Sequence, residues 1–155
     1  PITKTVFGFA STVGDFSIIW HVTGLLYAIG SMDRLKQAIA LSVALGAESI
    51  IVNQGVKRIF RRERPTVSGD DRFDVRTPST SSFPSGHASS ATVAAIILIW
   101  MTGFPLAILW IIMAGVVALS RVVVRIHHLS DIVGGVITGA VLGAIAVPII
   151  SSIIG

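Results

Sequence analysis

The sequence predicts an all-α fold: a polytopic transmembrane bundle of about five spanning helices, preceded by a short N-terminal interfacial helix. Hydrophobic residues make up 52% of the 155 residues and charged residues only 13%, whereas a soluble domain carries about 25% charged residues. The mean hydropathy of +0.82 agrees with this composition. We therefore expect one domain, residues 1–155, that crosses the cell membrane several times.

Five apolar stretches define the expected spanning helices, each near the roughly 20 residues that a bilayer requires. In chain order they are residues 16–32, 35–56, 84–102, 105–124 and 131–151. Polar turns separate them, and the longest polar break runs over residues 57–82. Residues 1–15 are too short to span, and with Val6, Phe7 and Phe9 we expect them to lie along the membrane interface.

Charge and cysteine content exclude several classes of protein. Of the 12 Lys and Arg residues, seven lie between Lys57 and Arg76, and the net charge is +4. In so apolar a chain this cluster indicates lipid headgroups or phosphates as partners, and no nucleic acid. There is no cysteine, which rules out a thiolate nucleophile, a disulfide and a cysteine-based metal site. The N-terminus lacks the pattern of a cleavable signal peptide.

Small residues repeat in the third and fifth expected helices. Gly135, Gly139 and Gly143 form two overlapping GxxxG patterns, which allow close helix approach in lipid. We expect packing within one chain, with a homo-oligomer formed through these faces as the alternative.

The expected topology brings the polar residues to one membrane face. With five spans, the break at residues 57–82 and the link at residues 121–131 lie on the same side. The end of the second helix, the start of the third, the end of the fourth and the start of the fifth therefore converge there.

Two polar groups at this face indicate a phosphate site. Lys57 and Arg64 lie seven residues apart, and such side chains bind phosphate as a point charge and as a bidentate donor. Pro84-Ser85-Gly86-His87 opens a helix whose free N–H groups attract anions. Simpler interpretations are a capped helix with an interfacial His, and a basic loop against lipid headgroups. We expect the latter for Arg58, Arg61 and Arg62.

The third polar group joins Arg121 to His127 and Asp131. A His four residues before an Asp can donate Nδ1–H to the carboxylate, which leaves Nε2 as a nucleophile or base. Arg121 lies at the membrane edge, where burial of a cation requires an anionic partner. The alternative is a His–Asp pair that only fixes the loop.

Together the three groups predict a phosphoryl-transfer mechanism. The expected phosphate ligands are Lys57, Arg64, Arg121 and the amides of Ser85 and Gly86. His127 attacks phosphorus, Asp131 orients His127, and His87 protonates the leaving oxygen and then activates water. Because phosphoryl transfer depends mainly on positioning and charge stabilisation, we expect no metal ion and no other cofactor.

These motifs resemble the signature of the type 2 phosphatidic acid phosphatase (PAP2) family. The family patterns K-x6-R-P, P-S-G-H and S-R-x5-H-x3-D match residues 57–65, 84–87 and 120–131, at all eleven fixed positions. The resemblance implies the roles given above. It also implies a lipid phosphate as substrate: phosphatidic acid, phosphatidylglycerol phosphate, a polyprenyl diphosphate or a polyprenyl-linked sugar phosphate. Membrane members often have six spans, so this chain looks like a minimal form.

The predicted function is therefore an integral membrane lipid phosphatase acting through a phosphohistidine. The alternatives are a lipid phosphotransferase, a non-catalytic lipid-phosphate carrier and a vanadate-dependent oxidase. A metallohydrolase is a further alternative, with His87, His127, His128 and Asp131 as metal ligands. The positive-inside rule places the site in the cytoplasm. However, several of the cations are assigned to phosphate, and the resemblance favours the outer face, which we adopt.

Three further polar residues receive weaker predictions. Glu48 lies inside the second span, where an acid is a functional candidate, but we favour a structural role for it. We expect His21 to contact another helix, and His128 to be structural or interfacial.

Overall fold

The computed structural model describes residues 2–65 and 80–154, which form helices connected by turns and short extended segments. The long helices are α1 (Ile2–Val13), α2 (Ile18–Ala28), α3 (Met32–Ile50), α5 (Gly86–Thr102), α6 (Leu106–Val123) and α7 (Leu129–Ile154). A 3₁₀ turn, η1 (Asp15–Ser17), joins α1 to α2. A π-helical stretch, η2 (Ile51–Val56), and the short α4 (Lys57–Ile59) continue α3.

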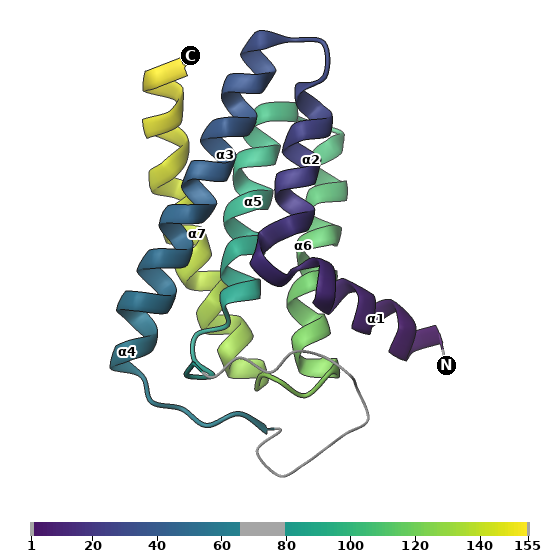
Figure 1. The fold of residues 1–155 in the computed structure, drawn as a ribbon, viewed down its shortest axis with the longest axis vertical. Helices are drawn as coiled ribbons and strands as arrows, with labels where there is room; N and C mark the ends of the chain where they lie inside the picture. Colours follow the sequence, from purple (N-terminus) through teal and green to yellow (C-terminus); the bar gives the residue numbers. More distant parts are fainter. Residues whose placement is uncertain (1, 66–79, 155) are drawn as a thin grey trace.

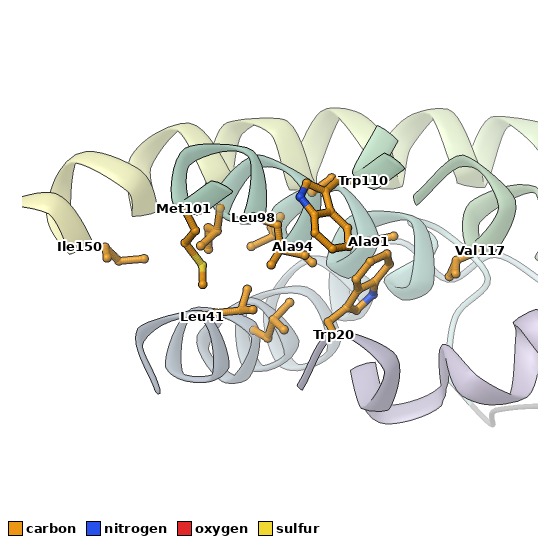
Figure 2. Packing of buried hydrophobic residues seen from close by; sticks show 13 residues of the cluster. Trp20, Leu41, Ala91, Ala94, Leu98, Met101, Trp110, Val117 and Ile150 are labelled. Atoms are coloured by element: carbon orange, nitrogen blue, oxygen red, sulfur yellow. The ribbon is translucent and has the colours of Figure 1, made fainter. Parts of the chain in front are cut away.

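Helix α5 lies at the centre of the bundle, among α2, α3, α6 and α7 (Figure 1). Its apolar side chains surround it rather than forming one stripe, which is typical of a helix that is buried on most sides. Figure 2 shows Trp20 of α2, Leu41 of α3 and Trp110 of α6 converging on this helix. The central helix therefore holds the other elements in position.

The glycines of α7 let it approach α5 closely. A Cβ atom on Gly139 would lie 2.4 Å from the carbonyl oxygen of Ser89, and one on Gly135 would lie 2.5 Å from that of Ser85. This face is therefore occupied within one chain, as the first of the two alternatives predicts. Self-association stays a prediction with no surface assigned to it.

Four of the five expected helices are present close to their predicted limits, but the first is much shorter. The α2 helix has 11 residues and so a length of about 16 Å, against a hydrocarbon core of about 30 Å. It is short because Ser17 (φ 59°) and Gly30 (φ 80°) interrupt the backbone on either side. Within residues 2–65 and 80–154, three helices are long and apolar enough to span: Met32–Ile59, α6 and α7. The count of five spans is therefore not confirmed.

The outer surfaces of α6 and α7 are suited to lipid. Large apolar side chains point outward along both helices; examples are Ile111, Ile112, Val133, Ile137 and Ile145. In water such a surface would be an aggregation hazard, whereas lipid chains solvate it. The membrane protein predicted from composition is confirmed.

The predicted convergence of polar helix ends is also observed. Figure 1 shows α4, the start of α5, the end of α6 and the start of α7 at the lower end of the bundle. The turns that follow α2 and α5 lie at the opposite end. Helix α1 projects sideways and packs on α6, so its last turn reaches the same region.

Candidate active site

A cavity of about 480 Å³ opens where these helix ends meet. Six of the eight predicted site residues line it: Lys57, Arg64, Gly86, His87, Arg121 and His127. They come from three separate stretches of the chain, which the fold brings together around one cavity. Asp131 and Ser85 are fully buried and do not line the cavity.

His127 is held in a tight turn after α6. The backbone N–H groups of Ile126 and His127 both donate to the carbonyl oxygen of Arg121, at 3.0 and 3.1 Å. The His127 side chain is only 2% exposed. Its Nε2 lies 3.2 Å from Nη1 of Arg64. Because a guanidinium can only donate, Nε2 is the unprotonated, lone-pair nitrogen of the ring.

The link from His127 to Asp131 differs from the prediction. Nδ1 of His127 lies 3.5 Å from Oδ2 of Asp131, too far for a strong direct hydrogen bond. The Ser82 hydroxyl lies between them: its Oγ is 3.3 Å from Nδ1 and donates to Oδ2. A hydroxyl can donate and accept at once. Ser82 therefore accepts a hydrogen bond from Nδ1–H and donates one to the carboxylate, which fixes the His127 ring relative to Asp131.

The Asp131 carboxylate is itself fixed by other donors. His128 N–H donates to Oδ2 at 2.8 Å, and Arg62 Nη1 donates to Oδ1 at 2.8 Å and to Ser130 Oγ at 2.7 Å. The expectation that Arg62 faces lipid headgroups is therefore wrong: this side chain folds back onto α7 because a buried carboxylate lies within its reach. Arg58 and Arg61 are exposed, and their contact with lipid headgroups stays a prediction.

The Arg64 side chain lines the cavity and contacts two loops. Its guanidinium donates to the carbonyl oxygens of Thr80, Ser81 and Ile126 at 3.1 to 3.3 Å. These neutral acceptors fix the orientation of the guanidinium and contribute no opposite charge. Lys57 lies nearby, with Nζ 3.5 Å from Thr80 Oγ1 and 3.6 Å from the position that a Cβ atom on Gly86 would take.

Arg121 supplies the third cation. Its Nη1 donates to Ser11 Oγ, and it lies 3.5 Å from the Ser11 carbonyl oxygen. Its Nε and Nη2 are buried, with no hydrogen-bond partner among the residues that the structure describes. A buried guanidinium with unmet donors is costly, so an anion placed in the cavity would stabilise it.

His87 approaches the cavity from α5. Its Nε2 lies 3.0 Å from Asp15 Oδ1 and 3.3 Å from the Ser11 carbonyl oxygen. The segment between α1 and α2 therefore forms one wall of the site. Neither Ser11 nor Asp15 is among the site residues predicted from the motifs.

Ser85 is placed differently from the prediction. Its N–H donates to the Asp131 carbonyl oxygen at 2.9 Å, so this amide is not available to a phosphate. Its hydroxyl caps α5 by accepting from Ala88 N–H at 3.4 Å. Ser85 therefore positions the helix, and of the pair only Gly86 reaches the cavity.

The electrostatics of the cavity keep His127 neutral. Burial is the main cause, and the charges of Arg64, Arg121 and Lys57 act in the same direction, lowering the pKa of His127 from its ordinary value to about 2. A neutral imidazole with Nδ1–H held by Ser82 presents its lone pair on Nε2. This is the form that a nucleophile requires.

The weaker predictions have separate outcomes. His21 contacts another helix, as expected, with Nδ1 2.9 Å from Ser42 Oγ. Glu48 is buried and lines the cavity. In the part of the chain that the structure describes, no three His, Cys, Asp or Glu side chains are arranged to hold a metal ion. Arg72 and Arg76, counted in the basic cluster, lie outside the described residues.

Comparison with known proteins agrees with this geometry. The family model described as "PAP2 superfamily" matches residues 37–153, most of the chain. The chain belongs to the PAP2 superfamily. A decaprenylphosphoryl-5-phosphoribose phosphatase of Mycobacterium tuberculosis (strain CDC 1551 / Oshkosh) is 38% identical over 136 residues, covering 87% of this chain and 73% of that one.

Two further matches extend the comparison. An undecaprenyl-diphosphatase of Sulfolobus acidocaldarius is 26% identical over 145 residues, covering 93% of this chain and 69% of the relative. The crystal structure of a transmembrane PAP2-type phosphatidylglycerolphosphate phosphatase from Bacillus subtilis has the same fold, with a TM-score of 0.69 at 22% identity. That match covers 99% of this chain and 79% of the other. The PAP2 protein described here is a membrane lipid phosphatase.

Proposed function

We propose that this PAP2 phosphatase hydrolyses its lipid phosphate by transferring the phosphoryl group to Nε2 of His127 and then to water. The observation that carries the proposal is the pairing of an unprotonated Nε2 with three buried cations around one cavity. No described residue other than His127 offers an imidazole lone pair next to Arg64.

In the first step the phosphate enters the cavity and its oxygens are bound by Lys57, Arg64 and Arg121. The N-terminus of α5, at Gly86, adds its dipole. Nε2 of His127 attacks phosphorus in line with the leaving oxygen. The ring gains positive charge as the P–N bond forms, and Ser82 and Asp131 stabilise that charge through Nδ1–H.

His87 acts in both steps, as an acid toward the leaving lipid oxygen and then as a base toward the attacking water. It gives a proton to the leaving lipid oxygen as the P–O bond breaks. It then removes a proton from the water that attacks the phosphohistidine, which returns His127 to its neutral form. Charge stabilisation by preorganised cations supplies the main rate enhancement, so the proposal requires no metal ion.

The cavity also supports a substrate class. Besides the predicted site residues, the cavity is lined by five further polar residues: Ser17, His21, Glu48, Ser49 and Asn53. Such a wall suits a hydroxyl-bearing headgroup better than a bare hydrocarbon. Because the mycobacterial relative is named a decaprenylphosphoryl-5-phosphoribose phosphatase, we propose a polyprenyl-linked sugar phosphate as substrate. A polyprenyl diphosphate is the second candidate, because the Sulfolobus relative is named for that activity.

A substrate panel in detergent tests this proposal. Purified enzyme with excess chelator is given a polyprenyl-linked ribose phosphate, a polyprenyl diphosphate, phosphatidic acid and phosphatidylglycerol phosphate, and released phosphate is measured. We expect the highest kcat/KM on the first, and none from His127→Ala. A preference for the diphosphate favours the second candidate. Release from none of them would contradict the hydrolase and favour a carrier.

We also propose that the active site faces the outside of the cell. Lys57, Arg62 and Arg64 are engaged within the site and should not be counted in the positive-inside rule. The resemblance to outward-facing family members then supports the outer face. An impermeant maleimide should label Arg61→Cys in intact cells and should not label Lys36→Cys at the opposite end. The reverse labelling would place the site in the cytoplasm.

A further inference from the structure

The last turn of α1 and the residues that join it to α2 form one segment, residues 11–17, which reaches into the active site and contacts His87 and Arg121. Asp15 Oδ1 lies 3.0 Å from Nε2 of His87, and the Ser11 carbonyl oxygen lies 3.3 Å from the same nitrogen. The Ser11 hydroxyl accepts from Nη1 of Arg121. Neither Ser11 nor Asp15 belongs to the three family motifs, which begin at Lys57.

The fit between this segment and His87 is close. A Cβ atom on Gly14 would lie 2.7 Å from Cδ2 of His87 and 3.0 Å from Cγ1 of Val117. Only glycine permits the backbone to lie against the imidazole here without a shift. Ser11 is also buried, with 1% of its surface exposed. The segment is therefore packed as part of the site wall.

Both oxygens near Nε2 of His87 are acceptors, a carboxylate and a carbonyl. That nitrogen must therefore carry a proton, and Nδ1 is the nitrogen that can exchange one. We infer that Asp15 is a positioning residue that fixes the ring and tautomer of His87 and supports its protonated form during phosphate-ester cleavage. This inference rests on the phosphohistidine mechanism proposed above.

The proton balance of the reaction follows from this arrangement. Imidazolium His87 donates Nδ1–H to the leaving oxygen as the P–O bond breaks, and becomes the neutral ring with Nε2–H still held by Asp15. The Nδ1 lone pair then takes a proton from the attacking water as the P–N bond to His127 breaks. Asp15 stays ionised throughout, and His87 returns to its starting form.

Leaving-group dependence separates this role from a structural one. Dodecyl phosphate has an alkoxide leaving group that needs a proton, whereas 4-dodecyl-2-nitrophenyl phosphate has a phenolate that leaves without one. First-turnover release is measured for both in wild type and in Asp15→Asn, a substitution of equal size. Asp33→Asn is the matched control, because Asp33 lies at the far end of the bundle and pairs with Lys36.

General acid–base catalysis contributes roughly 10²- to 10⁴-fold in total. We expect Asp15→Asn to lose about 10- to 100-fold of this on the alkyl ester. The loss on the nitrophenyl ester should be under about threefold, because cleavage of that ester needs no proton. Asp33→Asn should match wild type on both. Equal losses on the two esters, or no loss on either, would overturn the positioning role.

A double variant provides a test even where Asp15→Asn alters stability. If Asp15 acts through His87, then His87→Ala and His87→Ala/Asp15→Asn should cleave the alkyl ester at the same rate. A further loss in the double variant as large as that of Asp15→Asn alone would refute the inference. Failure of the proposed function is distinct: wild type would then release nothing from either ester, or His127→Ala would be as active as wild type.

Discussion

Replacing Ser82 by alanine removes the hydroxyl that joins His127 to Asp131. Ser82 Oγ lies 3.3 Å from Nδ1 and donates to Oδ2 of the buried carboxylate, while Nδ1 and Oδ2 are themselves 3.5 Å apart. Without the hydroxyl, no described group of hydrogen-bonding geometry connects the two. The nucleophile would keep its place in the turn but lose the acceptor for Nδ1–H.

The size of the effect follows from the charge that develops on the ring. A hydrogen bond to a charged group contributes about 1.5–3 kcal/mol, which is roughly 10- to 150-fold in rate. The imidazole becomes positive only when the P–N bond forms, so the interaction is stronger in the transition state than in the bound substrate. The loss should therefore appear in kcat, with KM little changed.

The assay is steady-state phosphate release from a lipid phosphate in detergent, with thermal unfolding measured in parallel. Ser81→Ala is the matched control: its hydroxyl accepts from Arg62 N–H at 3.1 Å and donates to the Phe83 carbonyl oxygen at 3.3 Å, away from the nucleophile. Ser82→Ala with unchanged kcat, or Ser81→Ala with an equal loss, would refute the reasoning.

Three further outcomes are expected. Arg62→Ala should lower kcat about fivefold, a value reduced for the partial exposure of this ion pair, whereas Arg58→Ala should not; equal kcat values for the two would remove Arg62 from the site. Gly139→Ala should lower the unfolding temperature in detergent, since overpacking costs about 1–3 kcal/mol. Gly115→Ala, with nothing within 4 Å of its Cβ position, should not, so equal shifts would contradict the close packing. The ring ¹⁵N signals of His127 in the ligand-free protein should not titrate between about pH 8 and pH 5, because its pKa is lowered to about 2. The unfolded chain takes up this proton below its ordinary pKa of about 6.5, so this group makes the fold less stable as pH falls.

Much of the fold could be predicted because apolar length and polar breaks are local properties. The helices after residue 32 follow their predicted limits closely, and the convergence of their ends follows from counting membrane crossings. The first helix did not follow, because backbone conformation at Ser17 and Gly30 ends it early. The apolar composition of a stretch does not predict which of its residues adopt a positive φ.

The cations and histidines that line the cavity could be predicted from the motifs, but the groups that contact them could not. Ser82 and Arg62 reach across 49 and 69 residues of chain to Asp131, and no periodicity marks such pairs. Ser82 directly precedes the Phe83-Pro84 step, and nothing distinguishes it from the serines beside it. Asp15 did carry a signal, because an acid at the edge of an apolar stretch needs a partner.

The central claim is that His127 becomes phosphorylated, and trapping the phosphoenzyme tests it most directly. Wild type is mixed with a lipid phosphate labelled with ³²P at the scissile group, quenched in base, digested, and the labelled peptide is sequenced. We predict an acid-labile, base-stable label on His127, formed at least as fast as turnover and absent from His127→Ala. Turnover without any labelled protein, or a label on another residue, would contradict this mechanism.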